Sequence, residues 1–186
     1  MNHPSTLPEI LDSLDGNRRL AAEVFARVPE ALLIAGDPEH WSPAHHLAHL
    51  TATSKAVARG LRSDSLPLHP TGSSRTYAEV RDAATQSLAD TPRETLLEMG
   101  RTVVIGRTVA RADIVDAFES ASRELRKAAS TWSEAEFNRR AMTHPLAGPM
   151  TVREMLLFMV VHERHHLKIV RRRIEAESGD SQAVAG

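Results

Sequence analysis

Apolar side chains recur at steps of three and four residues along four segments of the chain, which is the periodicity of amphipathic α-helices. The segments are residues 6–29, 43–61, 111–131 and 151–176. No stretch alternates apolar and polar side chains convincingly enough to predict a β-strand. The chain has 186 residues, a length that suits one domain. We therefore expect an all-α protein, a four-helix bundle formed by residues 1–176, with a disordered tail at 177–186.

Helix start signals support three of these segments. Ser42 followed by Pro43 is a typical N-cap with proline in the first helical position. Asp113 is a candidate N-cap for the third segment. Thr151 and Glu154 have the spacing of a capping box, in which each side chain accepts from the other's backbone N–H.

The region between the second and third helices, residues 62–110, does not fit a simple connection. Its first part, 63–75, is rich in Ser, Pro and Gly, which is typical of a loop. Two weaker helical patterns follow at 76–89 and 92–99. We interpret 62–110 as a helical insertion that acts as a lid.

The last predicted helix carries histidine where a bundle normally has apolar residues. Its inward-facing positions step by three and four, and they are Val152, Met155, Met159, His162, His166 and Ile169. Residues four apart lie on the same face of a helix, one turn from each other. His162 and His166 can therefore converge on one metal ion.

A third ligand is available on the second predicted helix, where His45, His46 and His49 lie close together. His46 and His49 lie nearer the apolar stripe of that helix than His45, so one of them can face the last helix. Three neutral imidazoles with one open position are typical of a catalytic metal site. The alternative is that these histidines are hydrogen-bonded residues of the core.

Composition excludes several other functions. The chain has no cysteine, so thiol chemistry would require an external thiol. Its 23 Lys and Arg balance 24 Asp and Glu, which gives no field to attract nucleic acid or an anionic membrane. The first residues lack the pattern of a secretory signal, and the longest apolar run, Met155 to Val161, is too short to span a bilayer. We expect a cytoplasmic protein with a small-molecule partner.

Two segments resemble the DinB-like family of metalloenzymes. Trp41 to Leu50 resembles the family signature in which Trp-Ser opens a helix and a metal-binding histidine follows eight positions after the Trp; here it is His49. His144 to Ile169 resembles the closing helix, whose two ligands are spaced by four. The resemblance implies a bundle of the DinB-like type with Zn, Ni or Fe bound by His49, His162 and His166.

The resemblance covers roughly 20–61 and 111–175, and two positions depart from the family pattern. His45 stands where an acidic or amide residue is frequent, which makes it a possible fourth ligand. Lys168 stands where Gln is frequent, so a contact made by that Gln is not expected here.

Three functions are consistent with these features. The resemblance implies a thiol-dependent transferase that uses a low-molecular-weight thiol such as bacillithiol, mycothiol or glutathione, and it also implies a homodimer. A second possibility is a hydrolase that activates water, with Glu163 or His45 as the base. A third is a non-catalytic metal-binding protein of stress response or storage, which a fourth ligand at His45 would favour.

His162 to His166 also match the His-Glu-x-x-His pattern of zinc proteases. The longer protease motif requires Gly and His where Ile169 and Arg172 stand, so we do not expect proteolysis. Glu163 is then either a base or a solvated helix residue paired with a nearby Lys or Arg. His144 is expected to be an ordinary loop residue, with the alternative that it lines the mouth of the site.

Overall fold

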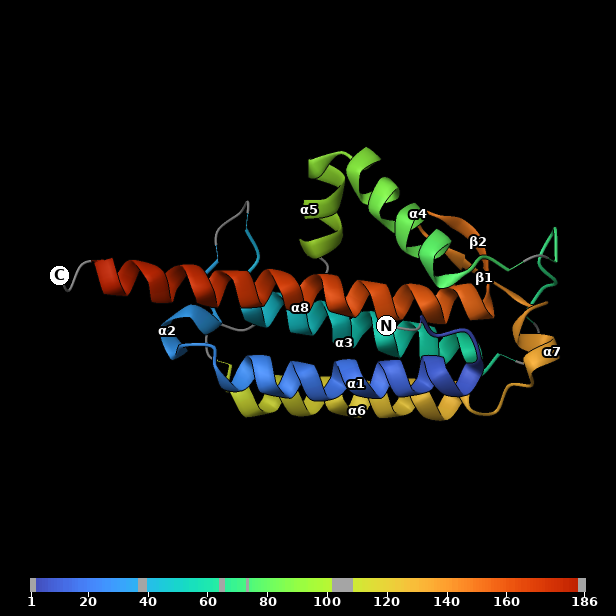
Figure 1. Ribbon diagram of the computed structural model, residues 1–186, viewed down its shortest axis with the longest axis horizontal. Coiled ribbons are helices and arrows are strands. Elements are labelled where there is room, and N and C mark those ends of the chain that lie inside the picture. The colour runs from blue at the N-terminus through green and yellow to red at the C-terminus, as the bar shows by residue number, and fades with distance from the viewer. Residues whose placement is uncertain (1–2, 37–39, 64–65, 73, 102–108, 184–186) are drawn as a thin grey trace.

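The computed structural model describes residues 3–36, 40–63, 66–72, 74–101 and 109–183. The long helices are α1 (Leu7–Ala26), α3 (Pro43–Leu61), α6 (Arg111–Ala129) and α8 (Val152–Ala183). The shorter helices are α2 (Glu30–Leu33), α4 (Tyr77–Asp90), α5 (Arg93–Arg101) and α7 (Glu134–Phe137). Strands β1 (Ala141–His144) and β2 (Gly148–Thr151) form an antiparallel pair. The fold is mostly helical with one small sheet (Figure 1).

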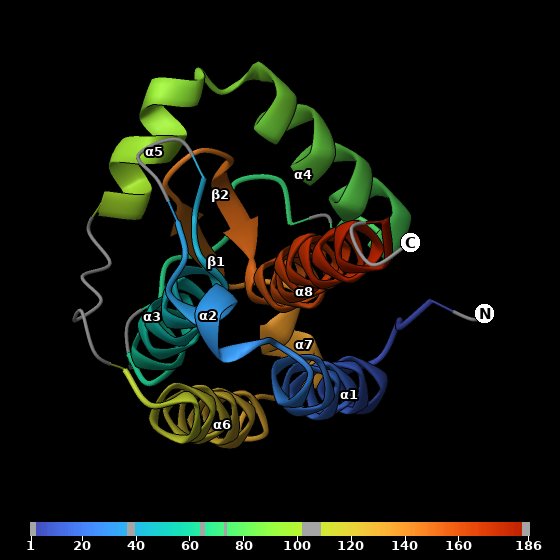
Figure 2. The same cartoon turned by 90° about the vertical axis from the view of Figure 1, so that its left-hand side faces the viewer.

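The four long helices run side by side, and α1 and α3 each contact both α6 and α8 (Figure 2). Their apolar faces meet in two hydrophobic clusters. One contains Leu11, Leu125 and Leu156, and the other contains Phe25 and Leu50. Burial of such side chains is the main force that holds the helices together, since each contributes roughly 1.5–3 kcal/mol.

The predicted helix starts are confirmed at two of three places. Ser42 caps α3, and its hydroxyl accepts a hydrogen bond from the His45 backbone N–H at 3.2 Å. The Thr151 N–H donates to the Glu154 carboxylate, and the Glu154 N–H donates to the Thr151 hydroxyl, both at 3.1 Å. Asp113 is not an N-cap, because α6 begins two residues earlier. It lies in the first turn, where a carboxylate interacts favourably with the helix dipole.

The β-hairpin is a correction to the all-α expectation. Its strands pair Ala141 with Thr151 and His144 with Gly148. Four-residue strands are too short to show a clear alternation, and Pro149 in β2 is typical of a loop or an edge strand. The backbone of Gly148 has a φ of +71°, a conformation that glycine adopts without strain. The short helices α2 and α7 were not predicted either, because their segments show no helical pattern.

The middle segment forms α4 and α5, close to the predicted 76–89 and 92–99. Helix α4 packs against α8 (Figure 1), and the buried side chains of Tyr77 and Val80 anchor it. In the described residues, no helix combines the length and apolar character needed to cross a bilayer.

Helix α8 is longer than expected. The sequence predicts its end near residue 176 and a disordered tail at 177–186, but the helix continues to Ala183. No proline interrupts this part of α8, so the helical hydrogen-bond pattern can continue. Residues 184–186 lie outside the described part of the chain.

Candidate metal centre

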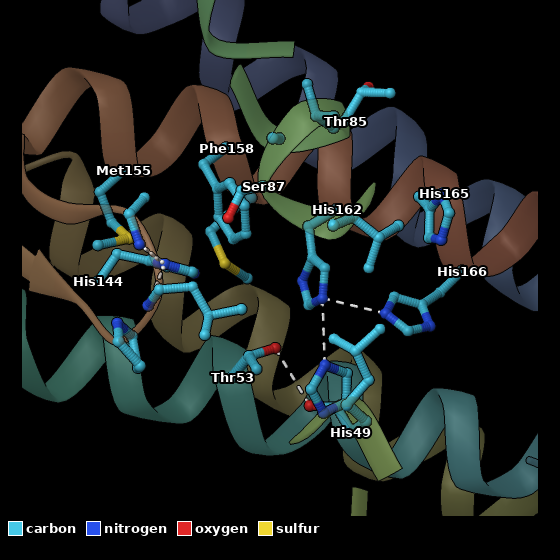
Figure 3. A pocket seen from close by; sticks show the side chains of 18 of the residues that line it. His49, Thr53, Thr85, Ser87, His144, Met155, Phe158, His162, His165 and His166 are labelled. Carbon is cyan, nitrogen blue, oxygen red and sulfur yellow. Dashed lines mark hydrogen bonds between the residues drawn. The ribbon is translucent and has the colours of Figure 1, made fainter. Parts of the chain in front are cut away.

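The structure brings the Nε2 atoms of three histidines together between α3 and α8. His49 Nε2 lies 3.1 Å from His162 Nε2, and His166 Nε2 lies 3.0 Å from the same atom. All three ligand atoms lie within 4.8 Å of one another. His162 and His166 project from adjacent turns of α8, and His49 faces them from α3 (Figure 3).

This donor set fits a divalent metal ion. Metal–nitrogen bonds of roughly 2.0–2.1 Å in a tetrahedral site place ligand nitrogens about 3.3 Å apart, close to the spacing seen here. Burial, as the largest cause, lowers the pKa of His49 to about 4 and that of His162 to about 3. Burial also holds the pKa of His166 well below its usual value. All three imidazoles are therefore neutral near pH 7, with lone pairs available for a metal.

His46 contacts the ring of His166 at its Nδ1 atom and not at the Nε2 atom that faces the other two histidines. Its Nδ1 lies 2.7 Å from the Nδ1 of His166, and its side chain is buried. Trp41 stacks on His166, with ring centroids 5.8 Å apart. The sequence pattern made His46 a candidate ligand and did not predict this supporting role. The signal for it was its position three residues before His49, on the same side of the helix.

The Nδ1 side of the His162 ring is held by packing. In the described part of the chain, its Nδ1 atom is buried without a hydrogen-bond partner. Phe158 stacks on it with ring centroids 5.2 Å apart and an interplanar angle of 18°. Phe158 precedes His162 by four residues, so the two rings share one face of α8. No expectation drawn from the sequence included Phe158.

His45, the possible fourth ligand, lies apart from the three converging nitrogens. Its Nδ1 is 2.8 Å from the hydroxyl of Ser42, and it is not a member of the three-histidine group. Lys168 is exposed on α8.

Glu163 faces α1 rather than the histidine cluster. Its carboxylate accepts a hydrogen bond from Asn17 Nδ2 at 3.0 Å, and Arg164 donates to the Oδ1 of the same Asn17 at 3.1 Å. Only 1 % of Glu163 is exposed, so the expectation of a solvated helix residue is wrong. Burial raises the pKa of its carboxyl to about 8. A catalytic role for Glu163 stays a prediction.

The histidine cluster opens into a cavity of about 1000 Å³. Residues of α3, α4, α5, α8 and the β-hairpin line it, and Glu163 is not among them. His144 lies at the end of β1 and lines this cavity, with its ring 4.4 Å from that of Phe158. The expectation of an ordinary loop histidine is therefore wrong, and the alternative position near the site is correct.

Comparison with known families identifies the chain. The family model of the DinB superfamily matches residues 13–170. Comparison with curated proteins and with solved structures gave no significant match. The family match extends from α1 into α8, and it includes the middle segment as well as His49, His162 and His166. This chain is a member of the DinB superfamily.

Proposed function

We propose that this protein is a metal-dependent enzyme, in which His49, His162 and His166 bind one divalent ion, Zn, Ni or Fe. The long helices would form the four-helix bundle of the DinB-like type, with residues 62–110 as a lid over the site. One observation carries the proposal: three neutral imidazoles converge at the wall of a cavity of about 1000 Å³.

The arrangement favours a catalytic ion over a structural one. Structural zinc sites are usually closed by four protein ligands, whereas catalytic sites keep a position for water or substrate. In the described residues, the group contains three ligands, and His45 is paired with Ser42 instead. When bound, the ion would lower the pKa of a coordinated thiol and so provide a thiolate at neutral pH.

We favour a thiol-dependent transferase. The cavity is at the upper end of the size range of small-molecule sites, so it has room for a thiol and an electrophile together. The sulfur would form a bond to the electrophilic carbon, the leaving group would depart with its electron pair, and the thiol proton would pass to solvent. The role of the chain is to hold both reactants in contact and to exclude water with apolar walls.

The two alternatives have less support. A hydrolase requires a base within reach of the reacting water, but Glu163 is bound to Asn17 and does not line the cavity. A non-catalytic metal-binding protein would be favoured by a fourth protein ligand, and His45 is engaged by Ser42.

The first experiment is elemental analysis of the purified, untagged protein beside two variants. We expect about one metal ion per chain in the wild type, and loss of that metal in His162→Ala. His165→Ala is the matched control, because His165 is an exposed neighbour on α8 outside the three-histidine group, and it should keep its metal. A wild type without metal after reconstitution with Zn, Ni and Fe(II) would contradict the proposal.

The transferase activity needs a second experiment. The metal-loaded protein is incubated with an electrophile and with bacillithiol, mycothiol or glutathione, and the conjugate is measured by mass spectrometry. Conjugate formation that requires both metal and thiol would support the proposal. Ester or amide hydrolysis that does not respond to thiol would instead support the hydrolase.

Three further properties belong to this proposal. The partner would be a small molecule, the location cytoplasmic, and the assembly a homodimer. Sedimentation equilibrium of the metal-loaded protein tests the last of these directly.

A further inference from the structure

The part of the cavity beside the first turns of α8 is mostly apolar, with the ring of His144 as a polar neighbour of Phe158. Six side chains define this apolar chamber: Val57, Met142, Met150, Met155, Phe158 and Met159. Four of them are buried members of one hydrophobic cluster, on which Met142 and Phe158 pack. Figure 3 shows Met155 and Phe158 on the side of His162 that lies away from His166.

The chamber extends from the metal-binding nitrogens in one direction. Met155 precedes His162 by seven residues on α8, which corresponds to roughly 10 Å along the helix. Phe158 stacks on His162, so the apolar lining begins directly beside a ligand of the proposed metal. A molecule in the chamber would therefore have one end at the metal centre.

The six side chains of the chamber carry no charge, although three arginines, Arg75, Arg93 and Arg173, also line the cavity. In the described part of the chain, no aspartate or glutamate lines the cavity. Arg75 pairs with Glu154 at 3.0 Å, and Arg173 donates to the Trp41 carbonyl at 2.9 Å. A charge placed among the methionines would lose its hydration without gaining a partner, which is costly.

We propose that the apolar chamber binds the body of the substrate, and that this substrate is an uncharged molecule with an alkyl or aryl body. This inference rests on the proposed function, because it names the electrophile of the same site. Methionine side chains are unbranched, flexible and polarisable, so a lining with four of them can adapt to bodies of different shape. The enzyme would accept a series of apolar electrophiles rather than one.

The test uses simple probes and needs no activity. The protein as purified is titrated by calorimetry with 1-alkanols from 1-butanol to 1-octanol, and with n-alkylammonium ions of the same chain lengths. An alkanol hydroxyl has a lone pair for a metal and an ammonium has none, so the titrations are repeated after a chelator has removed any metal. A difference that persists without metal reports on the chamber. We expect alkanol affinity to rise about fourfold for each added methylene, and the matched ammonium to bind about tenfold more weakly or worse.

Variants locate the binding within the cavity. Met142 is half-buried on β1 and its tip lies against Gly60 of α3, so Met142→Glu should reduce alkanol affinity at least about tenfold and shift the preference toward alkylammonium. Met142→Gln adds no charge and should reduce alkanol affinity severalfold. It serves as the test if Met142→Glu does not fold. Ile169→Glu is the matched control: Ile169 lines the cavity beyond His166, so alkanol affinity should stay unchanged.

The outcomes separate this inference from the proposed function. Equal binding of alkanol and alkylammonium, no dependence on chain length, or folded Met142 variants with unchanged affinity would overturn the apolar chamber. Selective alkanol binding by a protein that binds no metal even after reconstitution would leave the chamber in place and contradict the metal-dependent enzyme instead.

Discussion

His46 contacts the proposed metal centre through its Nδ1 atom, which faces the Nδ1 of His166. Its Nδ1 lies 2.7 Å from the Nδ1 of His166, so it can accept the proton that His166 must carry there when its Nε2 binds a metal. Hydrogen-bond partners of this kind fix the tautomer of a ligand, and their loss typically weakens metal binding 10–100-fold. We expect His46→Ala to weaken zinc binding by roughly this factor, measured by competition with a chromophoric chelator.

The matched control for this prediction is His45→Ala. His45 is the preceding residue, and its ring contacts Ser42, so its removal should leave zinc affinity unchanged. A large loss in His45→Ala would make it the fourth ligand. Unchanged affinity in His46→Ala would contradict the supporting role.

Glu163 can be tested by an uncharged replacement of the same shape. Glu163→Gln keeps an oxygen that can accept from Asn17, and the side chain does not line the cavity. We therefore expect the variant to retain its metal, and to keep transferase activity within about a factor of two if Glu163 takes no part in the reaction. Paired measurements of metal content and turnover check this. A loss of turnover of about 100-fold or more at full metal content would assign Glu163 the role of a base.

At the scale of single residues, the sequence predicted the three-histidine group better than its surroundings. His162 and His166 stand out because they interrupt an apolar stripe, and the position of His49 follows from the family signature. The contact between His46 and His166 depends on how α3 and α8 pack. The orientation of Glu163 toward Asn17 depends on how α1 and α8 pack, since the two residues are 146 positions apart. Phe158, in contrast, lies on the same face of α8 as His162 and could have been found from its spacing.

At the scale of elements, the start of α8 is tied to the segment that leads into α4. Arg75 donates to Glu154 through its backbone N–H at 2.7 Å and through its side chain at 3.0 Å. Burial alone would raise the pKa of the Glu154 carboxyl, but hydrogen bonds from Arg75 and Thr151 outweigh it and leave this pKa below its usual value. The ionised form of Glu154 is therefore the one that stabilises the fold.

This pKa predicts a pH dependence of stability. A carboxyl whose pKa is lowered by folding stabilises the protein above its unfolded value of 4.5, and the contribution is lost as the pH falls through the lower folded value. We expect Glu154→Gln to cost about 1–2 kcal/mol at pH 7, a low figure because Arg75 is partly exposed. The difference from wild type should shrink as the pH falls below 4.5.

Urea unfolding between pH 3 and pH 7 measures this difference. Glu23→Gln, at an exposed position on α1, is the control and should match the wild type throughout. A Glu154→Gln variant with wild-type stability at pH 7 would show that the link between α8 and the α4 segment contributes nothing.

The long helices could be predicted from the sequence and the hairpin could not, because a prediction needs an element long enough for its apolar pattern to repeat. A helix of 19 or 20 residues, such as α3 or α1, repeats its apolar pattern over several turns. A strand of four residues has at most two side chains that face the core, which is too few to show an alternating pattern. The β1–β2 pair is instead specified by its contacts with the start of α8, among them the buried side chain of Met150.

At the scale of the whole molecule, a bound metal would link parts of the chain that are far apart in sequence. His49 and His162 are 113 positions apart, and they join α3 to α8 across the cavity. An ion that binds the folded state stabilises it by about 2.7 kcal/mol at a free concentration of 100 Kd. For a protein of this size, that corresponds to a rise in Tm of roughly 5–10 °C.

We therefore expect removal of the metal by a chelator to lower the Tm by about this amount, and re-addition of the ion to restore it. Differential scanning calorimetry of the stripped and reloaded protein measures the shift. His162→Ala should show no response to metal, because two imidazoles bind more weakly than three. His165→Ala should respond as the wild type does. The same Tm with and without metal, in a protein shown to contain one ion per chain, would mean that the ion is held equally well by the unfolded chain, and the preformed centre between α3 and α8 would then have to be abandoned.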